Sequence, residues 1–173
     1  IVLKVIVICA MLPLAIAPFI YCGKIVAHFP YSLDREEGFI LGQAIDMTKG
    51  VSIYRSLTHE PYTVGNYPPI YPWIYSLALR AGAEGLAPGR LINAIATFGI
   101  AVCIALASYR ISRDLFIALL ASMLFLAAYE VEYWIAFARV DLTALFFTAL
   151  GIFLFTLDRG WKSFVPATVK LRT

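Results

Sequence analysis

Apolar runs and polar stretches alternate along this chain. Four apolar runs cover residues 1–22, 91–109, 115–129 and 142–157. A helix needs about 20 mostly apolar residues to cross a bilayer, and each run approaches that length. The pattern predicts an all-α, polytopic membrane protein, a single domain over 1–173 with about four transmembrane helices.

A fifth apolar stretch, residues 70–81, follows two prolines and contains Arg80. Its length suits an interfacial helix better than a membrane crossing. If it does not cross, Lys4, the turn at Arg110 and Arg113, and the basic residues after 157 fall on one side. The positive-inside rule makes that side cytoplasmic. We therefore expect a cytoplasmic N-terminus and two extracytoplasmic loops, which cover residues 23–90 and 130–141.

One helix is expected inside the long first loop. Asp34 is a good N-cap residue, and Glu37 follows three positions later, as in a capping box. Ile40 and Ala44 belong to its loosely apolar face, and Gly50 is a typical helix stop. With the stretch at 70–80, the loop is predicted to carry two interfacial helices.

Composition supports the membrane class. The chain is 61% hydrophobic and 14% charged, against roughly 25% charged residues in a typical soluble domain. The net charge of +3 gives no argument for nucleic acid as a partner. Cys9, Cys22 and Cys103 lie in or beside apolar runs without metal-ligand spacing, so we interpret them as small packing residues.

The polar motifs of the two outer loops occur in a recognisable order. Glu36 and Glu37 precede Gly38, a short helix ends at Gly50, and Tyr67-Pro68-Pro69-Ile70-Tyr71 follows; the second loop contains Ala138-Arg139-Val140-Asp141. This order resembles the N-terminal portion of GT-C membrane glycosyltransferases. The most similar members are bacterial relatives of protein mannosyltransferases and of the lipid A aminoarabinose transferase. The resemblance implies a bacterial plasma membrane protein.

The resemblance also implies a reaction. GT-C enzymes transfer a sugar from a polyprenyl-phosphate donor to an extracytoplasmic acceptor. One acid of the first loop acts as general base, and the candidates by position are Glu36, Glu37 and Asp34. Asp141 matches an acid that binds a divalent cation, Mg²⁺ or Mn²⁺, or the donor phosphate in some members.

Sugar transfer from a lipid phosphate also needs groups that bind the phosphate and the lipid. A phosphate leaving group is stabilised by positive charge, and Arg139 is the candidate for that role. Tyr67 and Tyr71 are candidates for binding the lipid part of the donor.

Several alternatives stay open. Asp34 and Glu37 are also explained as helix caps, Glu36 as a solvated charge, and Asp141 as the cap of the last apolar helix. Four helices are fewer than a GT-C enzyme needs, so the chain is either the first part of a longer enzyme or a non-catalytic GT-C-derived subunit of a larger membrane complex. Membrane lipid is a partner in both cases, and other membrane subunits are partners in the second.

Overall fold

The computed structural model describes residues 2–55, 58, 65 and 67–157, and every regular element among them is a helix. The elements are α1 (Val2–His28), α2 (Arg35–Thr48), α3 (Ile70–Arg80), α4 (Ala87–Ser112), α5 (Leu115–Leu126), α6 (Tyr129–Trp134) and α7 (Asp141–Leu157). The all-α prediction is confirmed. His59 and the basic residues after 157 lie outside the described residues.

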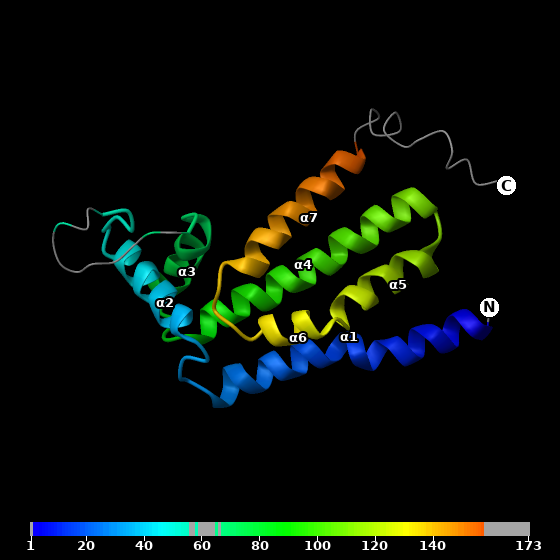
Figure 1. Cartoon of the computed structure of the whole chain (residues 1–173), viewed down its shortest axis with the longest axis horizontal. Coiled ribbons are helices and arrows are strands. Elements are labelled where there is room, and N and C mark those ends of the chain that lie inside the picture. Colours follow the sequence, from blue (N-terminus) through cyan, green and yellow to red (C-terminus); the bar gives the residue numbers. More distant parts are fainter. Residues whose placement is uncertain (1, 56–57, 59–64, 66, 158–173) are drawn as a thin grey trace.

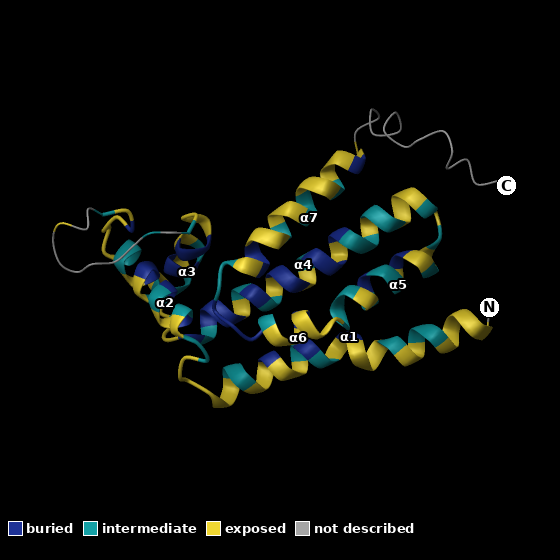
Figure 2. Cartoon of the chain, in the orientation of Figure 1, coloured by how far each residue is buried: buried dark blue, intermediate teal, exposed yellow. Residues whose placement is uncertain are grey.

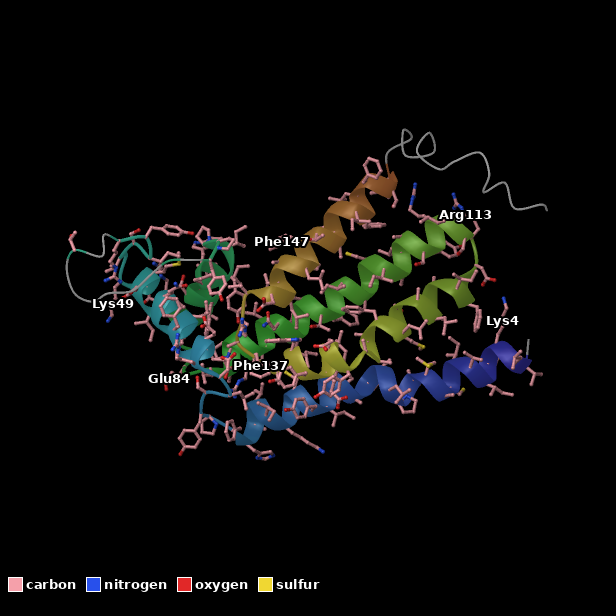
Figure 3. The ribbon with its side chains drawn as sticks, viewed as in Figure 1. Lys4, Lys49, Glu84, Arg113, Phe137 and Phe147 are labelled. Carbon is pink, nitrogen blue, oxygen red and sulfur yellow. The ribbon has the colours of Figure 1, made fainter. Side chains whose placement is uncertain are left out.

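Long helices form a bundle in which α4 is central (Figure 1). It packs against α1, α5 and α7, while α2 and α3 pair with each other at one end. Lys4 and Arg113 lie at the opposite end of the bundle from Lys49 and Glu84 (Figure 3). This is the arrangement expected if the two predicted outer loops lie on one side and the basic turn on the other.

The ends of α2 follow the local sequence signals. Asp34 accepts a hydrogen bond from the backbone N–H of Glu37 at 2.9 Å. Gly50 has a φ of +72°, and the backbone N–H groups of Gly50 and Val51 donate to the carbonyls of Met47 and Asp46. Those two bonds form a Schellman motif, which needs a left-handed residue where glycine is favoured. The predicted cap and stop are both confirmed.

α3 begins and ends where the sequence predicts, at Ile70 and Arg80. Tyr71 and Tyr75 are buried on one of its faces and pack against Ile40 and Ala44 of α2. The α2–α3 pair therefore has its own small apolar core at the end of the bundle.

The third apolar run differs from the expectation of one helix over 115–129. α5 ends at Leu126, Ala128 takes an extended conformation, and α6 begins at Tyr129. The new direction turns Val131 and Ile135, which are four residues apart, into the protein, where they are 6% and 0% exposed. Burial of this apolar face explains the break, and it makes residues 135–138 of the second predicted loop part of the core.

Two helices, α1 and α4, are long and apolar enough to cross a bilayer. They have 27 and 26 residues, or about 40 Å each at a rise of 1.5 Å per residue. Only 17% of the most apolar window of α1 is buried, and Figure 2 shows exposed positions along most of its length. α5 and α7 are shorter apolar helices of 12 and 17 residues.

Candidate functional site

A fully buried ion pair joins α2 to α4. Arg90 Nε and Nη2 donate to the two carboxylate oxygens of Glu37, each at 3.0 Å, and both side chains are at most 1% exposed. Arg90 also donates to the backbone carbonyls of Phe29 and Tyr31 at 2.5 and 2.7 Å. Such a pair is stable in the interior because further hydrogen bonds satisfy its remaining polar atoms.

Glu37 reaches two further backbone groups. The N–H of Leu33 donates to one of its oxygens at 2.6 Å and the N–H of Ala138 to the other at 2.7 Å. The carboxylate therefore accepts bonds from three elements of the chain: the α1–α2 link, α4 and the α6–α7 link. Its surroundings are those of an anchor that is saturated with hydrogen bonds.

Asn93 of α4 also forms hydrogen bonds with the backbone of the α6–α7 link. Its amide nitrogen donates to the carbonyls of Phe137 and Arg139 at 2.6 and 2.7 Å. Its amide oxygen accepts from the hydroxyl of Thr143 at 3.1 Å. The backbone on either side of Ala138 is thus fixed by two buried side chains, and the position of Arg139 is fixed with it.

The backbone of α4 also lies very close to α3 and to the α6–α7 link at Gly89. A Cβ atom on Gly89 would lie 2.6 Å from the ring of Tyr75 and 2.7 Å from Cβ of Ala138. Only glycine allows α4 to lie this near to both α3 and the α6–α7 link. The carbonyl of Gly89 accepts a hydrogen bond from the hydroxyl of Tyr71 at 2.9 Å.

Arg139 is the centre of a second, partly exposed cluster. Its Nη1 donates to Asp34 at 2.8 Å and its Nε to Asp141 at 3.0 Å, and its guanidinium lies 5.0 Å from the ring centre of Trp134. Partial burial lowers the pKa of Arg139, but the bonds to both carboxylates outweigh it and raise the pKa above the ordinary value. Arg139 is therefore a permanent cation beside two acids.

The remaining predicted site residues make contacts of their own. The hydroxyl of Tyr67 is 3.5 Å from a carboxylate oxygen of Glu36, which is a long contact by hydrogen-bond standards. Glu36 is half-buried. Tyr71 is buried, and burial, followed by the nearby Tyr75 and Glu37, raises its pKa well above the ordinary value. Its hydroxyl stays protonated and bonded to Gly89.

Two apolar grooves flank the start of α7. The first, the Tyr71 groove, has a volume of about 260 Å³ and is lined by Pro68, Ile70, Tyr71, Val140, Thr143, Ala144 and Phe147. The second, the Trp134 groove, has a volume of about 490 Å³ and is lined by Phe125, Ala128, Glu130, Val131, Trp134, Asp141, Leu142 and Leu145. Asp141 of the Arg139 cluster lines the Trp134 groove, and Val140, the residue between Arg139 and Asp141, lines the Tyr71 groove on the opposite face of α7.

The seven predicted site residues are thus divided by the structure. Asp34, Arg139 and Asp141 form one hydrogen-bonded cluster, and Glu36 and Tyr67 contact each other. Tyr71 is among the residues that line a groove, whereas Glu37 is enclosed together with Arg90.

Sequence reasoning missed Arg90 and Asn93, although a signal for both was present. Each is a polar residue at or inside the second apolar run, and such residues usually face a partner in the protein interior. The position of Glu37 also had a signal. It lies three, four, seven and eight residues before Ile40, Leu41, Ala44 and Ile45, and therefore on the apolar face of α2.

The metal site predicted at Asp141 stays a prediction. Within the described part of the chain, no group of three or more His, Cys, Asp or Glu side chains is arranged to hold a metal ion. Asp141 is instead bonded to Arg139.

Comparison of the chain with protein family models, with curated proteins and with solved structures finds no match. A proposal for its function therefore depends on the sequence motifs and on the geometry of the site.

Proposed function

We propose that this chain is an integral membrane protein that transfers a sugar from a polyprenyl-phosphate donor to an acceptor outside the membrane. The observation that carries the proposal is the Asp34–Arg139–Asp141 cluster, with Glu36 two residues after Asp34 in the chain and an apolar groove on each of two faces of α7. It combines a fixed cation, carboxylates and apolar surface at one end of an apolar bundle. A lipid-linked phosphate sugar needs all three.

Membrane insertion is supported by the exposed apolar surface. In water, exposed apolar patches as large as the outer faces of α1 and α7 are rare on monomeric proteins. Their exposed side chains include Leu3, Ile6 and Ile20 of α1 and Ile152 and Phe155 of α7. Lys4, Arg110 and Arg113 gather at the far end of the bundle, which favours a cytoplasmic N-terminus. In this arrangement the Arg139 cluster faces the extracytoplasmic side of a bacterial plasma membrane.

Glu36 is the general base of the proposed reaction. The acceptor hydroxyl oxygen attacks the anomeric carbon of the sugar and gives its proton to Glu36. The bond from that carbon to the phosphate oxygen breaks, and its electron pair leaves with the lipid phosphate. Glu36 fits this role because it is half-buried and its contact with Tyr67 is long.

Arg139 stabilises the departing phosphate. A guanidinium has five N–H donors, and the bonds to Asp34 and Asp141 use two of them. The two carboxylates hold the guanidinium plane in place, so little ordering is left to do when a phosphate binds. The apolar part of the donor lies in the Tyr71 groove, beside Tyr67.

Transfer is tested with the full chain in phospholipid vesicles. The donors are polyprenyl phosphates that carry radiolabelled mannose or aminoarabinose, the acceptor hydroxyls are those of an added serine- and threonine-rich peptide and of water, and loss of label from the donor is measured. Glu36→Gln should lower the rate by about 10²–10⁴-fold, as expected for loss of a general base, and Arg139→Ala by about 10²–10³-fold. Glu132→Gln, on the exposed side of α6, is the matched control and should keep the rate.

Absence of donor turnover, or equal rates for the wild-type protein and Glu36→Gln, would contradict the proposal. The second candidate, a non-catalytic subunit of a membrane complex, would then be favoured. It is supported by the internal pairing of Asp34, Glu37 and Asp141, all of which already have protein partners.

A further inference from the structure

The Trp134 groove differs from the Tyr71 groove in the charge at its edge. Glu130 and Asp141 are the charged residues that line the Trp134 groove, and its other lining residues are apolar. Among the described residues that line the Tyr71 groove, none is charged. The Trp134 groove therefore matches a ligand with an apolar tail and a polar head, within the usual size range of about 300–1,000 Å³.

Both acids are held at the groove without being enclosed. Glu130 is exposed, and one of its oxygens accepts from the indole N–H of Trp134 at 3.2 Å. The side chain of Asp141 is 54% exposed while it accepts from Arg139. A carboxylate offers about four lone-pair positions, and each of these bonds uses one.

The balance of charge around the groove is negative. Glu130, Asp141 and Asp34 contribute three negative charges, and Arg139 contributes one positive charge. An anionic head group is disfavoured next to Glu130 and Asp141, whereas an ammonium group is favoured by charge and by hydrogen bonding. Arg139, stacked on Trp134, lies within the same region as a partner for a phosphate.

We propose that the Trp134 groove binds a phospholipid whose head group carries a primary ammonium beside its phosphate, as in phosphatidylethanolamine. The ammonium donates to Glu130 and Asp141, the phosphate faces Arg139, and one acyl chain lies over Val131, Leu142 and Leu145. This inference rests on the membrane location in the proposed function, and it shares Arg139 with the proposed sugar transfer.

Fluorescence quenching of Trp134 tests the inference. Trp73→Phe and Trp161→Phe leave Trp134 as the single tryptophan of the full chain. The protein is placed in phosphatidylcholine vesicles with equal fractions of chain-brominated phosphatidylethanolamine, phosphatidylglycerol or phosphatidylcholine. We expect brominated phosphatidylethanolamine to quench Trp134 about two- to fivefold more effectively than the others, the preference that one or two partly exposed ion pairs supply.

Charge variants identify the cause of the preference. Glu130→Gln keeps an acceptor for the indole N–H and should reduce the preference, and the double variant Glu130→Gln/Asp141→Asn should abolish it. Glu132→Gln removes an acid of the same helix that is not among the residues lining the groove, so the preference should remain.

Three results would overturn the inference. Equal quenching by all brominated lipids would contradict head-group recognition and leave the membrane location intact. Loss of the preference in Glu132→Gln as well would assign it to net charge rather than to the groove. Absence of quenching by every brominated lipid would contradict both the groove and the membrane location. If the protein transfers sugar but shows no preference for brominated phosphatidylethanolamine, the lipid-binding inference is wrong while the proposed function stands.

Discussion

Glu36 and Glu37 are neighbours in α2, yet they belong to two different regions. Glu37 is enclosed with Arg90 and accepts four hydrogen bonds. Glu36 is half-buried, and its contact with Tyr67 is long. A saturated acid has no capacity left for a substrate, whereas a partly solvated one has. The Glu37–Arg90 anchor is therefore structural, and the Arg139 cluster is the candidate for chemistry, although the Glu36-Glu37-Gly38 motif by itself does not distinguish the two acids.

The strongest test of this difference between Glu36 and Glu37 is to neutralise each acid separately. Glu37→Gln leaves the charge of Arg90 buried and unpaired, and loss of one partner of a buried ion pair costs about 3–5 kcal/mol. Glu36→Gln removes a half-exposed charge and should change stability by less than about 0.5 kcal/mol. The measurement is the free energy of unfolding in detergent micelles, followed by circular dichroism.

Equal losses of stability in Glu36→Gln and Glu37→Gln would contradict the division into two regions. A double variant, Glu37→Leu/Arg90→Met, sharpens the test because it removes both charges. It should recover only part of the loss, since the backbone groups of Phe29, Tyr31 and Ala138 lose their partners. Full recovery would show that those backbone bonds contribute little.

Substitution of Asn93 is expected to cause the next largest loss of stability. Asn93→Ala leaves the carbonyls of Phe137 and Arg139 without their buried donor. Unsatisfied buried groups cost roughly 1–3 kcal/mol each, and partial relaxation of the link should hold the total near about 2–3 kcal/mol. The same unfolding measurement checks this.

Thr97→Val is the matched control for Asn93→Ala. Thr97 is also fully buried in α4, but its hydroxyl donates within the helix to the carbonyl of Asn93 at 2.8 Å. Valine has a similar shape, so this variant should lose less than Asn93→Ala. A larger loss in Thr97→Val would mean that the hold on the α6–α7 link is not what makes Asn93 important.

Two glycines test the close approach of α4 to its neighbours. Gly89→Ala places a methyl group against Tyr75 and Ala138, and such overpacking costs about 1–3 kcal/mol. Gly42 in α2 is the control because a Cβ there has nothing within 4 Å. Gly42→Ala should stabilise the protein slightly, by about 0.5–1 kcal/mol, through helix propensity. Destabilisation of equal size in both variants would contradict the packing argument.

The helices that could be predicted are those with strong local signals. Asp34 and Gly50 define α2 through a side-chain cap and a left-handed residue, and both act over a few residues only. Helical spacing places Glu37 on the apolar face of α2 and Glu36 about 100° away from it, but the ion pair of Glu37 with Arg90, 53 residues later, required the tertiary arrangement. The same holds for the break at Ala128, which has neither glycine nor proline and follows from burial of Val131 and Ile135.

An exposed ion pair lies at the end of the bundle opposite α2 and α3, and removing it is expected to change the stability of the protein least. Lys4 donates to Asp114 at 2.8 Å, and Asp114 also caps α5 by accepting from the N–H of Phe116 at 2.8 Å. These two bonds, Lys4 first, lower the pKa of Asp114 below its ordinary value. A lowered pKa in the folded state means that the contribution to stability is present above about pH 4, the unfolded value, and is lost as the pH falls through the folded pKa.

Asp114→Asn isolates the charge from the cap, because asparagine caps a helix about as well as aspartate does. The thermal midpoint of the wild-type protein should exceed that of Asp114→Asn slightly near neutral pH, and the difference should vanish below about pH 4. Salt should reduce the difference as well, since the pair is exposed. Parallel pH profiles for the two proteins would contradict a role for the Lys4 charge. Here a visible ion pair between distant segments contributes least, because water competes for both partners, whereas the enclosed pair of Glu37 and Arg90 has no such competitor.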